Sequence, residues 1–499
     1  MDKGHSQMKR TILIHLVILL YCSLSSCEKV DEFPIDIQTN DFVWKGLNAY
    51  YLYQDEINDL SDRRFNNDIE LERYLRAYPS PEAIFNALAK PTDGLSSIIS
   101  DYNTLGDPIP QRTAFTSGFE FAVIRDPSRI DSVVGYGLDV LPLSYASTEN
   151  IARGDFFYAV LNEQNDTIQL TEDNYEDALL DYPQDTLKLL MADYNGLIMM
   201  PNGERVDLVR EQYQHPAIQI TQTFDFTSQR VGYLMYNNDF SSNYSDALNT
   251  VIQNFKSQSV NELIIDLRYN VGGGAYDSTV AELASMITGQ FENQILIKET
   301  WNNKAQQWFE LNQPDSLLTY FPRTLENGVA INGLHLTDVY IVLNGNGFEG
   351  NTVSELLINS LKPYINVHVI GNTTNGENRA SITLYDSPDY NFTNPNANHT
   401  YALQPVVLSF SNSIDETYDL GLSPTVAVCP IEDPLNLGVL GENSDPILNS
   451  VLNYITTGST GNTIPCNPFD FEVLYHSIDQ QRLTDNRIFT RQKLPDLGR

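Results

Sequence analysis

The hydrophobic positions of the chain follow different spacings in successive regions, and each spacing predicts a different kind of structure. Residues 28–112 are polar with isolated aromatic anchors, which indicates a small helical N-terminal domain. Residues 113–218 contain short apolar runs such as 119–124, which predict strands and a β-rich domain. Residues 219–460 alternate strand-like and helix-like runs, and residues 461–499 form a C-terminal extension.

The alternation in the third region is that of an α/β domain. Buried strands are expected at 231–236, 263–267, 339–343 and 367–370. Between and after them, Ser245 is expected to cap one helix, Gly289 to end a second and Asp445 to open a third. This pattern predicts β/α layers joined by right-handed crossovers.

Residues 8–27 have the pattern of a leader peptide. The apolar run at 11–21 follows two basic residues and is too short to span a membrane. Residues 24–27 read LSSC and resemble a bacterial lipobox, in which Cys27 is lipidated and becomes the first residue after cleavage. An ordinary secretory signal that ends near a cysteine is the alternative. We expect residues 1–27 to be a lipoprotein signal peptide, and the protein to be lipid-anchored in a bacterial cell envelope, periplasmic or surface-exposed.

The charge balance limits the possible partners. The chain has 30 Lys and Arg against 65 Asp and Glu, a formal net charge of −35. Nucleic acids and anionic membrane surfaces are therefore poor direct ligands, because phosphate binding needs clustered cations. Cys429 and Cys466 follow the leader, and both a disulfide and two separate thiols are compatible with the sequence. The scattered histidines show no ligand spacing, so neither a metal nor another cofactor is predicted.

Two glycine-containing loops are candidates for chemistry. The first, DLRYNVGGG at 266–274, joins a buried strand to a helix. Its bare backbone N–H groups can surround a developing oxyanion, although for the glycines alone a tight strand-to-helix turn is the favoured explanation. The second, GFEGNTVSE at 347–355, also follows a strand, at the edge where open α/β sheets place their sites.

Taken together, these segments resemble the C-terminal processing (tail-specific) serine peptidases, in the PDZ-containing bacterial lipoprotein branch. The matching segments occur in the family's order along most of the mature chain: 42–48, 118–121, 151–155, 266–273, 400–405 and 421–424. The resemblance implies an α/β fold, with a crotonase-like β/α peptidase core, an inserted PDZ-like β-rich domain and a small helical N-terminal domain.

The catalytic dyad that the resemblance implies is altered in this sequence. The family places its nucleophilic serine at the start of a Ser-Ala-Ser-Glu run and a lysine 25 residues later, and these positions hold Thr352 and Glu377. A neutral lysine is a suitable general base, whereas a carboxylate is a weaker base and adds negative charge near the oxyanion. The implied oxyanion donors, the backbone N–H groups of Gly272 and Val353, do not depend on side chains.

Thr352 also has a structural interpretation. With Glu355 three residues later it matches a capping box, which we favour over a nucleophilic role. Ser354 is the other hydroxyl near the nucleophile position. Lys362 could be considered as a replacement base, but it is expected to be a solvated cation at the helix end.

The PDZ-like segment implies a peptide-binding groove formed by Gly118, Phe119 and Phe121. Addition of a polypeptide C-terminus as an extra strand is the expected binding mode. Because the segment at 118–121 contains no Lys or Arg, backbone N–H groups would hold the carboxylate.

Three functions are compatible with these features. The first is a catalytically degenerate envelope lipoprotein that keeps the peptidase fold and binds polypeptide C-termini, with its lipid as the only membrane contact. The second is an active serine-type endopeptidase that uses Thr352 or Ser354. The third is a non-catalytic scaffold subunit.

Overall fold

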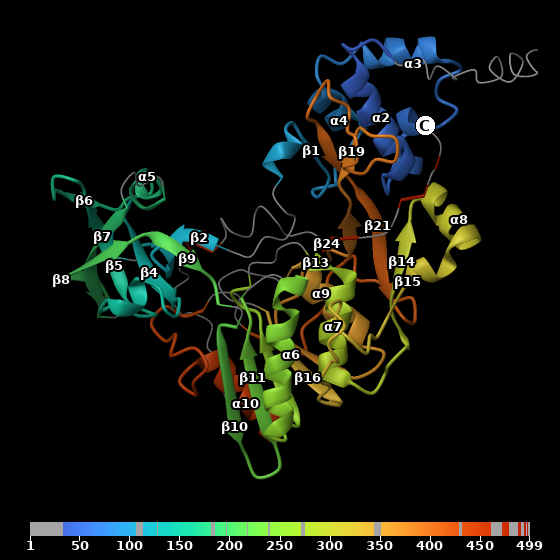
Figure 1. Cartoon of the computed structure of the whole chain (residues 1–499). Coiled ribbons are helices and arrows are strands. Elements are labelled where there is room, and N and C mark those ends of the chain that lie inside the picture. The colour runs from blue at the N-terminus through green and yellow to red at the C-terminus, as the bar shows by residue number, and fades with distance from the viewer. Residues whose placement is uncertain are drawn as a thin grey trace, which may run out of the picture.

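The computed structural model in Figure 1 describes most of the chain after the leader. The described residues are 33–105, 113–126, 128–180, 185–195, 197–216, 218–237, 240–270, 275–343, 351–428, 432–460, 472–478, 488–490, 494–495 and 497. Cys27, Gly272, Cys429 and Cys466 lie outside them, so the structure says nothing about the lipidation site, one oxyanion donor or the cysteine pairing.

A six-stranded sheet forms the centre of the α/β region. Its order is β10 (Ile220–Asp225), β11 (Arg230–Met235), β12 (Glu262–Asp266), β16 (Asp338–Val342), β17 (Asn366–Gly371) and β22 (Val426–Ala427). All neighbours run parallel except β10 and β11. The four strands expected from the apolar runs are β11, β12, β16 and β17, so this part of the prediction is confirmed.

Helices cover both faces of this sheet because its strands are apolar on both sides. Leu234, Ile265 and Ile341 belong to the core that includes α6 (Ser242–Ser257), α7 (Asp277–Thr288) and α9 (Thr352–Leu361). The alternate residues, such as Ile264 and Val342, belong to a second core with α10 (Pro446–Thr457). The result is a three-layer α/β arrangement (Figure 1).

Two of the three predicted helix ends are confirmed and one is wrong. Gly289 ends α7 in the left-handed conformation, and Asp445 caps α10 by accepting from the backbone N–H groups of Ile447 and Leu448. Helix α6 begins earlier than expected, with Ser241 at its N-cap. Ser245 lies inside the helix, and its hydroxyl donates to Glu282 of α7. The Ser245 side chain therefore contributes to the packing of α6 against α7 and does not cap α6.

A second sheet and the helical N-terminal region cover the α9 side of the core. The sheet has the order β13 (Ala275–Tyr276), β24 (Ile488–Phe489), β18 (Arg379–Ser381), β21 (Val406–Asn412), β14 (Ile295–Trp301) and β15 (Leu318–Tyr320). The remaining elements are α8 (Asn303–Asn312), α2 (Gln38–Tyr50), α3 (Asp68–Leu75), α4 (Pro81–Leu88), and a small sheet of β1 (Ser97–Ile99), β20 (Ala402–Gln404) and β19 (Leu384–Tyr385). As expected, helices dominate the described N-terminal residues.

The β-rich region stands beside the α/β core (Figure 1). Its main sheet contains β23 (Val473–His476), β3 (Phe119–Arg125), β4 (Val133–Val140), β5 (Phe156–Leu161), β7 (Thr186–Tyr194) and β8 (Met199–Val209), with β6 (Thr167–Gln169) paired to β5. Strands β2 (Thr113–Thr116) and β9 (Glu211–Gln214) form a separate pair, and α5 (Tyr175–Leu179) covers one face. Strand β23 comes from the C-terminal extension, which therefore joins this sheet.

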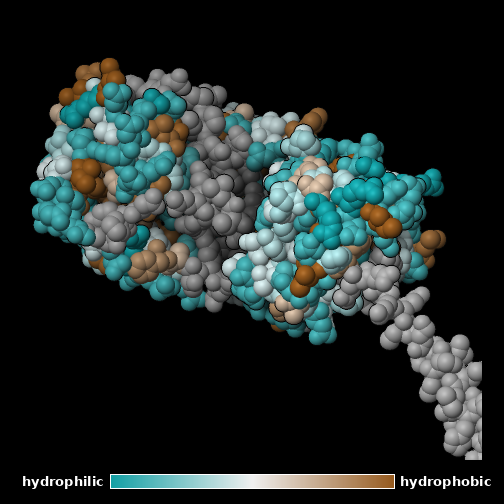
Figure 2. Space-filling view, turned by 90° about the horizontal axis from the view of Figure 1, so that it is seen from above, coloured by the Kyte–Doolittle hydropathy of each residue, from teal (hydrophilic) through white to brown (hydrophobic). Residues whose placement is uncertain are grey.

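The exposed surface is mostly polar. On the face in Figure 2, hydrophobic side chains form small separate patches in a largely hydrophilic surface, as expected from the large excess of acidic residues. Among the described residues, no helix is both long and apolar enough to cross a membrane.

Candidate active site

The two glycine-containing loops identified in the sequence meet at one edge of the six-stranded sheet. Strands β12 and β16 are parallel neighbours, so their carboxyl ends lie together. Asn351, just before α9, donates from Nδ2 to Oδ1 of Asn270 at 2.7 Å. Asn270 donates in turn to the carbonyl of Tyr236 at 3.0 Å, at the end of β11. The ends of three neighbouring strands are therefore tied together.

A buried cluster of charges fixes the first loop. Arg268 has no exposed surface and pairs with Asp266 at 2.8 Å, with Glu432 at 2.9 Å and with Asp445. The same carboxylate oxygen of Asp266, Oδ2, also accepts from the Tyr233 hydroxyl at 2.9 Å. Burial raises the pKa of Asp445, and Arg268 opposes that shift. Buried charges need such complete pairing, so the cluster holds Asp266 and Arg268, at the start of the loop, in place.

The β-rich domain contributes a second guanidinium to this cluster. Arg153 donates to Glu432, to the Tyr269 hydroxyl and to the carbonyl of Leu138. Burial by itself raises the pKa of Glu432, but Arg153, Arg268 and the Tyr269 hydroxyl together outweigh it, and the pKa is lowered. Glu432 therefore remains a carboxylate that joins the two domains. No sequence motif pointed to it.

The start of α9 differs from the sequence prediction by one residue. Asn351 is the N-cap, and its Oδ1 accepts the Ser354 N–H at 2.8 Å. Ser354 Oγ accepts the Asn351 N–H at 2.9 Å, which completes the capping box. The predicted box of Thr352 and Glu355 is wrong, because Asn351 is the last extended residue and Thr352 is already helical. Ser354 is also fully buried, with its hydroxyl held in the cap.

Glu355 binds the segment that contains the second dyad position. Its Oε1 accepts the Gly376 N–H at 2.6 Å and the Thr374 hydroxyl, and its Oε2 accepts the Glu377 N–H at 2.8 Å. Burial raises the pKa of Glu355, and these three donors oppose the shift. Through Glu355, the backbone of Glu377 is held against the first turn of α9, which begins with the buried Thr352.

The side chain of Glu377 is paired with a cation. Its Oε2 accepts from Arg379 Nη2 at 2.9 Å, and Arg379 Nη1 donates to the Tyr53 hydroxyl of the N-terminal domain at 2.8 Å. About a third or less of each charged side chain is exposed, 29% for Glu377 and 19% for Arg379. Sequence reasoning missed Arg379 and Tyr53, although Arg379 lies only two residues beyond the glutamate.

One predicted oxyanion donor can be located. Val353 is the second residue of α9 and is buried. Among the described residues, no oxygen accepts a hydrogen bond from its backbone N–H. Such a group at a helix N-terminus is suited to stabilising a negative charge.

The predicted peptide-binding residues lie together at the start of β3. Gly118 has a φ of +79°, and a Cβ there would lie 2.1 Å from the Cβ of Ser144, so this position requires glycine. Its N–H donates to Thr116 Oγ1 at 3.1 Å. Phe119 and Phe121 stack with ring centroids 6.0 Å apart and are buried. Peptide binding at these residues stays a prediction.

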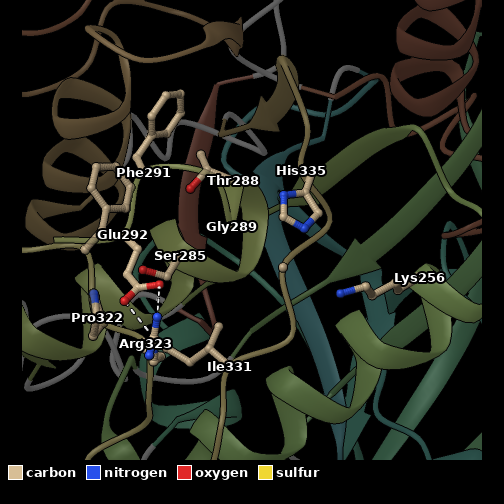
Figure 3. A pocket seen from close by; sticks show the side chains of 12 residues that line it. Lys256, Ser285, Thr288, Gly289, Phe291, Glu292, Pro322, Arg323, Ile331 and His335 are labelled. Carbon is tan, nitrogen blue, oxygen red and sulfur yellow. Dashed lines mark hydrogen bonds and ion pairs between the residues drawn. The ribbon is translucent and has the colours of Figure 1, made fainter. Parts of the chain in front are cut away.

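A separate pocket lies at the C-terminal ends of α6 and α7 (Figure 3). Lys256, Ser285 and His335 line it, together with an ion pair between Glu292 and Arg323 at 2.7 Å. None of its lining residues belongs to the two loops. The pocket is therefore distinct from the candidate active site.

Comparison with protein families agrees with this geometry. Residues 230–391, which contain both loops and both dyad positions, match the model of peptidase family S41. Residues 38–102 match the peptidase S41 N-terminal domain. These two segments are therefore similar to peptidase family S41, and the resemblance to C-terminal processing peptidases is confirmed at this level. Comparison with curated proteins finds no match.

A solved structure shows the same fold. A putative S41 protease from Bacteroides fragilis NCTC 9343 is 22% identical with a TM-score of 0.62, covering 84% of this chain and 97% of its own. A photosystem II D1 C-terminal processing protease is 15% identical with a TM-score of 0.45, covering 83% of this chain and 99% of its own. The first likeness supports a mixed α/β peptidase fold, as the sequence resemblance implied.

Proposed function

We propose that this protein is a lipid-anchored cell-envelope member of family S41 that has lost peptidase activity and retains binding of polypeptide C-termini. The observation that carries the proposal is the set of contacts that Glu377 makes. At the position of the family's lysine, a carboxylate is held by Arg379 through its side chain and by Glu355 through its backbone.

The arrangement opposes catalysis in two ways. A carboxylate that already accepts from a guanidinium is a poor base for an alcohol proton. Its negative charge also lies on the segment next to α9, where a tetrahedral intermediate would need positive charge. Arg379 compensates for part of that charge, but it is directed to Glu377 and Tyr53.

An active enzyme is the second candidate, and one observation favours it. Thr352, at the family's nucleophile position, is the first helical residue of α9 and is not a member of the capping box, which Asn351 and Ser354 form. The Val353 N–H lies in the first turn of α9, which supports its proposed role as an oxyanion donor. Ser354 is a poorer nucleophile candidate than Thr352, because its hydroxyl is part of the cap.

A direct test compares four proteins: the mature chain, Thr352→Ala, the double variant Thr352→Ser/Glu377→Lys, and Thr352→Ser/Glu377→Gln as the matched control without a base. Cleavage of unfolded proteins and of C-terminal peptides is measured for each. We expect no cleavage except by the double variant with lysine. Activity of the natural chain that Thr352→Ala abolishes would establish the active enzyme instead.

Peptide binding is tested separately. Peptides with free and with amidated C-termini are titrated against the chain and against Phe119→Ala. C-terminus recognition predicts weaker binding of the amidated form and of the variant. Equal affinity for both forms would rule out C-terminus recognition, and no binding at all would favour the scaffold function. Metabolic labelling with a fatty acid, compared between the natural chain and Cys27→Ala, tests the lipid anchor.

A further inference from the structure

The edge of β3, where a peptide would add as an extra strand, is already paired with another part of this chain. Strand β23 runs antiparallel to β3, with Val473 opposite Ile124 and His476 opposite Ala122. A register shift lies between residues 473 and 475. The C-terminal extension therefore supplies the outermost strand of the β-rich sheet.

Hydrogen bonds extend the pairing beyond both ends of β23. At one end the Arg125 N–H donates to the Glu472 carbonyl at 3.3 Å, and the two side chains form an ion pair at 2.8 Å. At the other end Ser477 donates its N–H to the Phe121 carbonyl at 2.9 Å, and its Oγ accepts the Phe121 N–H at 2.8 Å. The Ser477 hydroxyl donates to Glu120 at 2.5 Å. The paired segment is therefore residues 472–477, and the adjoining Ile478 is buried.

The side chains of this segment fill the space between β3 and α5. The ring of Tyr475 lies 6.1 Å from Phe121 on β3 and 6.4 Å from Tyr175 on α5, measured between centroids. Leu474 and Tyr475 pack against the core that contains Phe121 and Leu179. Tyr475 thus occupies an aromatic groove between a strand and a helix.

The direction of the segment matches that of an added ligand. From Glu472 to Ser477 the chain runs toward the start of β3, where Gly118 and Phe119 lie. We propose that the β3 edge is a strand-exchange site, with residues 472–478 as its resident occupant. When the resident strand leaves, the site takes up an extended peptide from another protein.

The contacts define the chemistry of that peptide. It needs an aromatic side chain for the groove between Phe121 and Tyr175. Two residues later it needs a serine or threonine, because that position both accepts from the Phe121 N–H and donates to Glu120. An acidic residue opposite Arg125 adds little, because that pair is exposed. This inference extends the proposed peptide binding by naming the groove's occupant and its partner.

The probe is a fluorescent peptide with the sequence of residues 472–478, acetylated and amidated so that it carries no terminal charge. The receptor is the full mature chain or its Tyr475→Ala variant. Removing the Tyr475 ring weakens the resident strand and leaves the groove intact. We expect the variant to bind the peptide at least about tenfold more tightly than the natural chain, since a larger fraction of its sites is open.

Phe489→Ala is the matched control. It lies on β24 of the same C-terminal extension, which pairs with β13 and β18 and not with β3. We expect the control to bind the peptide no better than the natural chain does. A folded Tyr475→Ala variant that binds no better than the control would overturn the proposal, as would equal binding of a peptide with alanine in place of the tyrosine.

A second measurement applies if Tyr475→Ala does not fold. Ala122→Cys/His476→Cys places a disulfide across a register pair of β3 and β23. Hydrogen exchange at the amides of 121–125 should be slower in the oxidised protein than in the reduced one, because the resident strand can no longer leave. Identical exchange would contradict the proposal. Failure of C-terminus recognition would leave both tests unaffected, since the probe is amidated.

Discussion

Arg153 Nη2 lies 2.5 Å from Glu432 Oε1, and only 8% and 5% of their side chains are exposed. Glu432 also binds Arg268, so one carboxylate joins the β-rich domain to the loop that follows β12. Removing one partner of a buried pair leaves an uncompensated charge. We therefore expect Arg153→Ala to lower the free energy of unfolding by about 3–5 kcal/mol, measured by urea denaturation.

Arg205→Ala is the control for this change. Arg205 pairs with Asp207 at the surface, where 41% of each side chain is exposed, so its removal should have little effect on stability. Equal effects of the two substitutions would show that the buried cluster does not connect the domains energetically.

Asp139 provides a pH-dependent contribution to stability. Burial raises its pKa to about 7, Arg153 opposes the shift and Glu120 adds to it. Because the ordinary value is about 3.9, the folded state binds this proton more tightly than the unfolded chain does. The stabilisation is complete below about pH 4 and is lost as the pH rises to about 7.

The substitution Asp139→Asn should therefore stabilise the protein progressively, relative to the natural chain, from pH 5 to pH 7, and by a constant amount above pH 7. The slope is at most about 1.4 kcal/mol per pH unit. Urea denaturation midpoints of both proteins at pH 5, 6, 7 and 8 measure this difference in stability. Asp415→Asn, at a side chain that is 76% exposed, is the control. A pH-independent difference for Asp139→Asn would contradict the assignment.

Asn351 combines two structural functions. It caps α9, and it donates to Asn270, which is fully buried. We expect Asn351→Ala to lower the free energy of unfolding by about 2–4 kcal/mol, the sum of a lost cap and a lost buried hydrogen bond to Asn270. Asn67→Ala removes an exposed N-cap of α3 and should cost only about 1 kcal/mol. Similar losses in the two variants would exclude the link between the loops.

Position 376 requires glycine for two reasons: its backbone conformation and the lack of space for a Cβ. Its φ is +84°, and a Cβ there would lie 2.6 Å from the Asp419 carbonyl oxygen. Gly203 has nearly the same φ, +83°, with open space around it. Gly203→Ala should therefore show only the backbone strain, about 1 kcal/mol, and Gly376→Ala should show a clearly larger loss in thermal denaturation. Equal shifts in Tm would mean that the 376 segment moves to accept the methyl group.

The sequence predicted the central sheet and its active edge well. Strands β11, β12 and β16 are largely continuous apolar runs, and only His368 interrupts the run in β17, since a parallel sheet covered on both faces needs mostly apolar residues. Each glycine-containing loop was expected to follow a strand, and the pairing of β12 with β16, which the structure shows, brings the ends of these two strands together. Helix ends were less certain, because adjacent polar residues such as Asn351 and Thr352 are both able to cap.

The sequence by itself determined the family, the three-layer core and the residues at the two dyad positions, because these depend on local patterns and on order along the chain. Tertiary structure alone decided which distant groups meet. Glu432 lies 164 positions beyond Arg268, and Tyr475 lies far from Phe121 along the chain. Ion pairs and strand edges select their partners by position in space, so no local pattern specifies them. The link from Glu377 through Arg379 to the distant Tyr53 likewise appears only once the chain has folded.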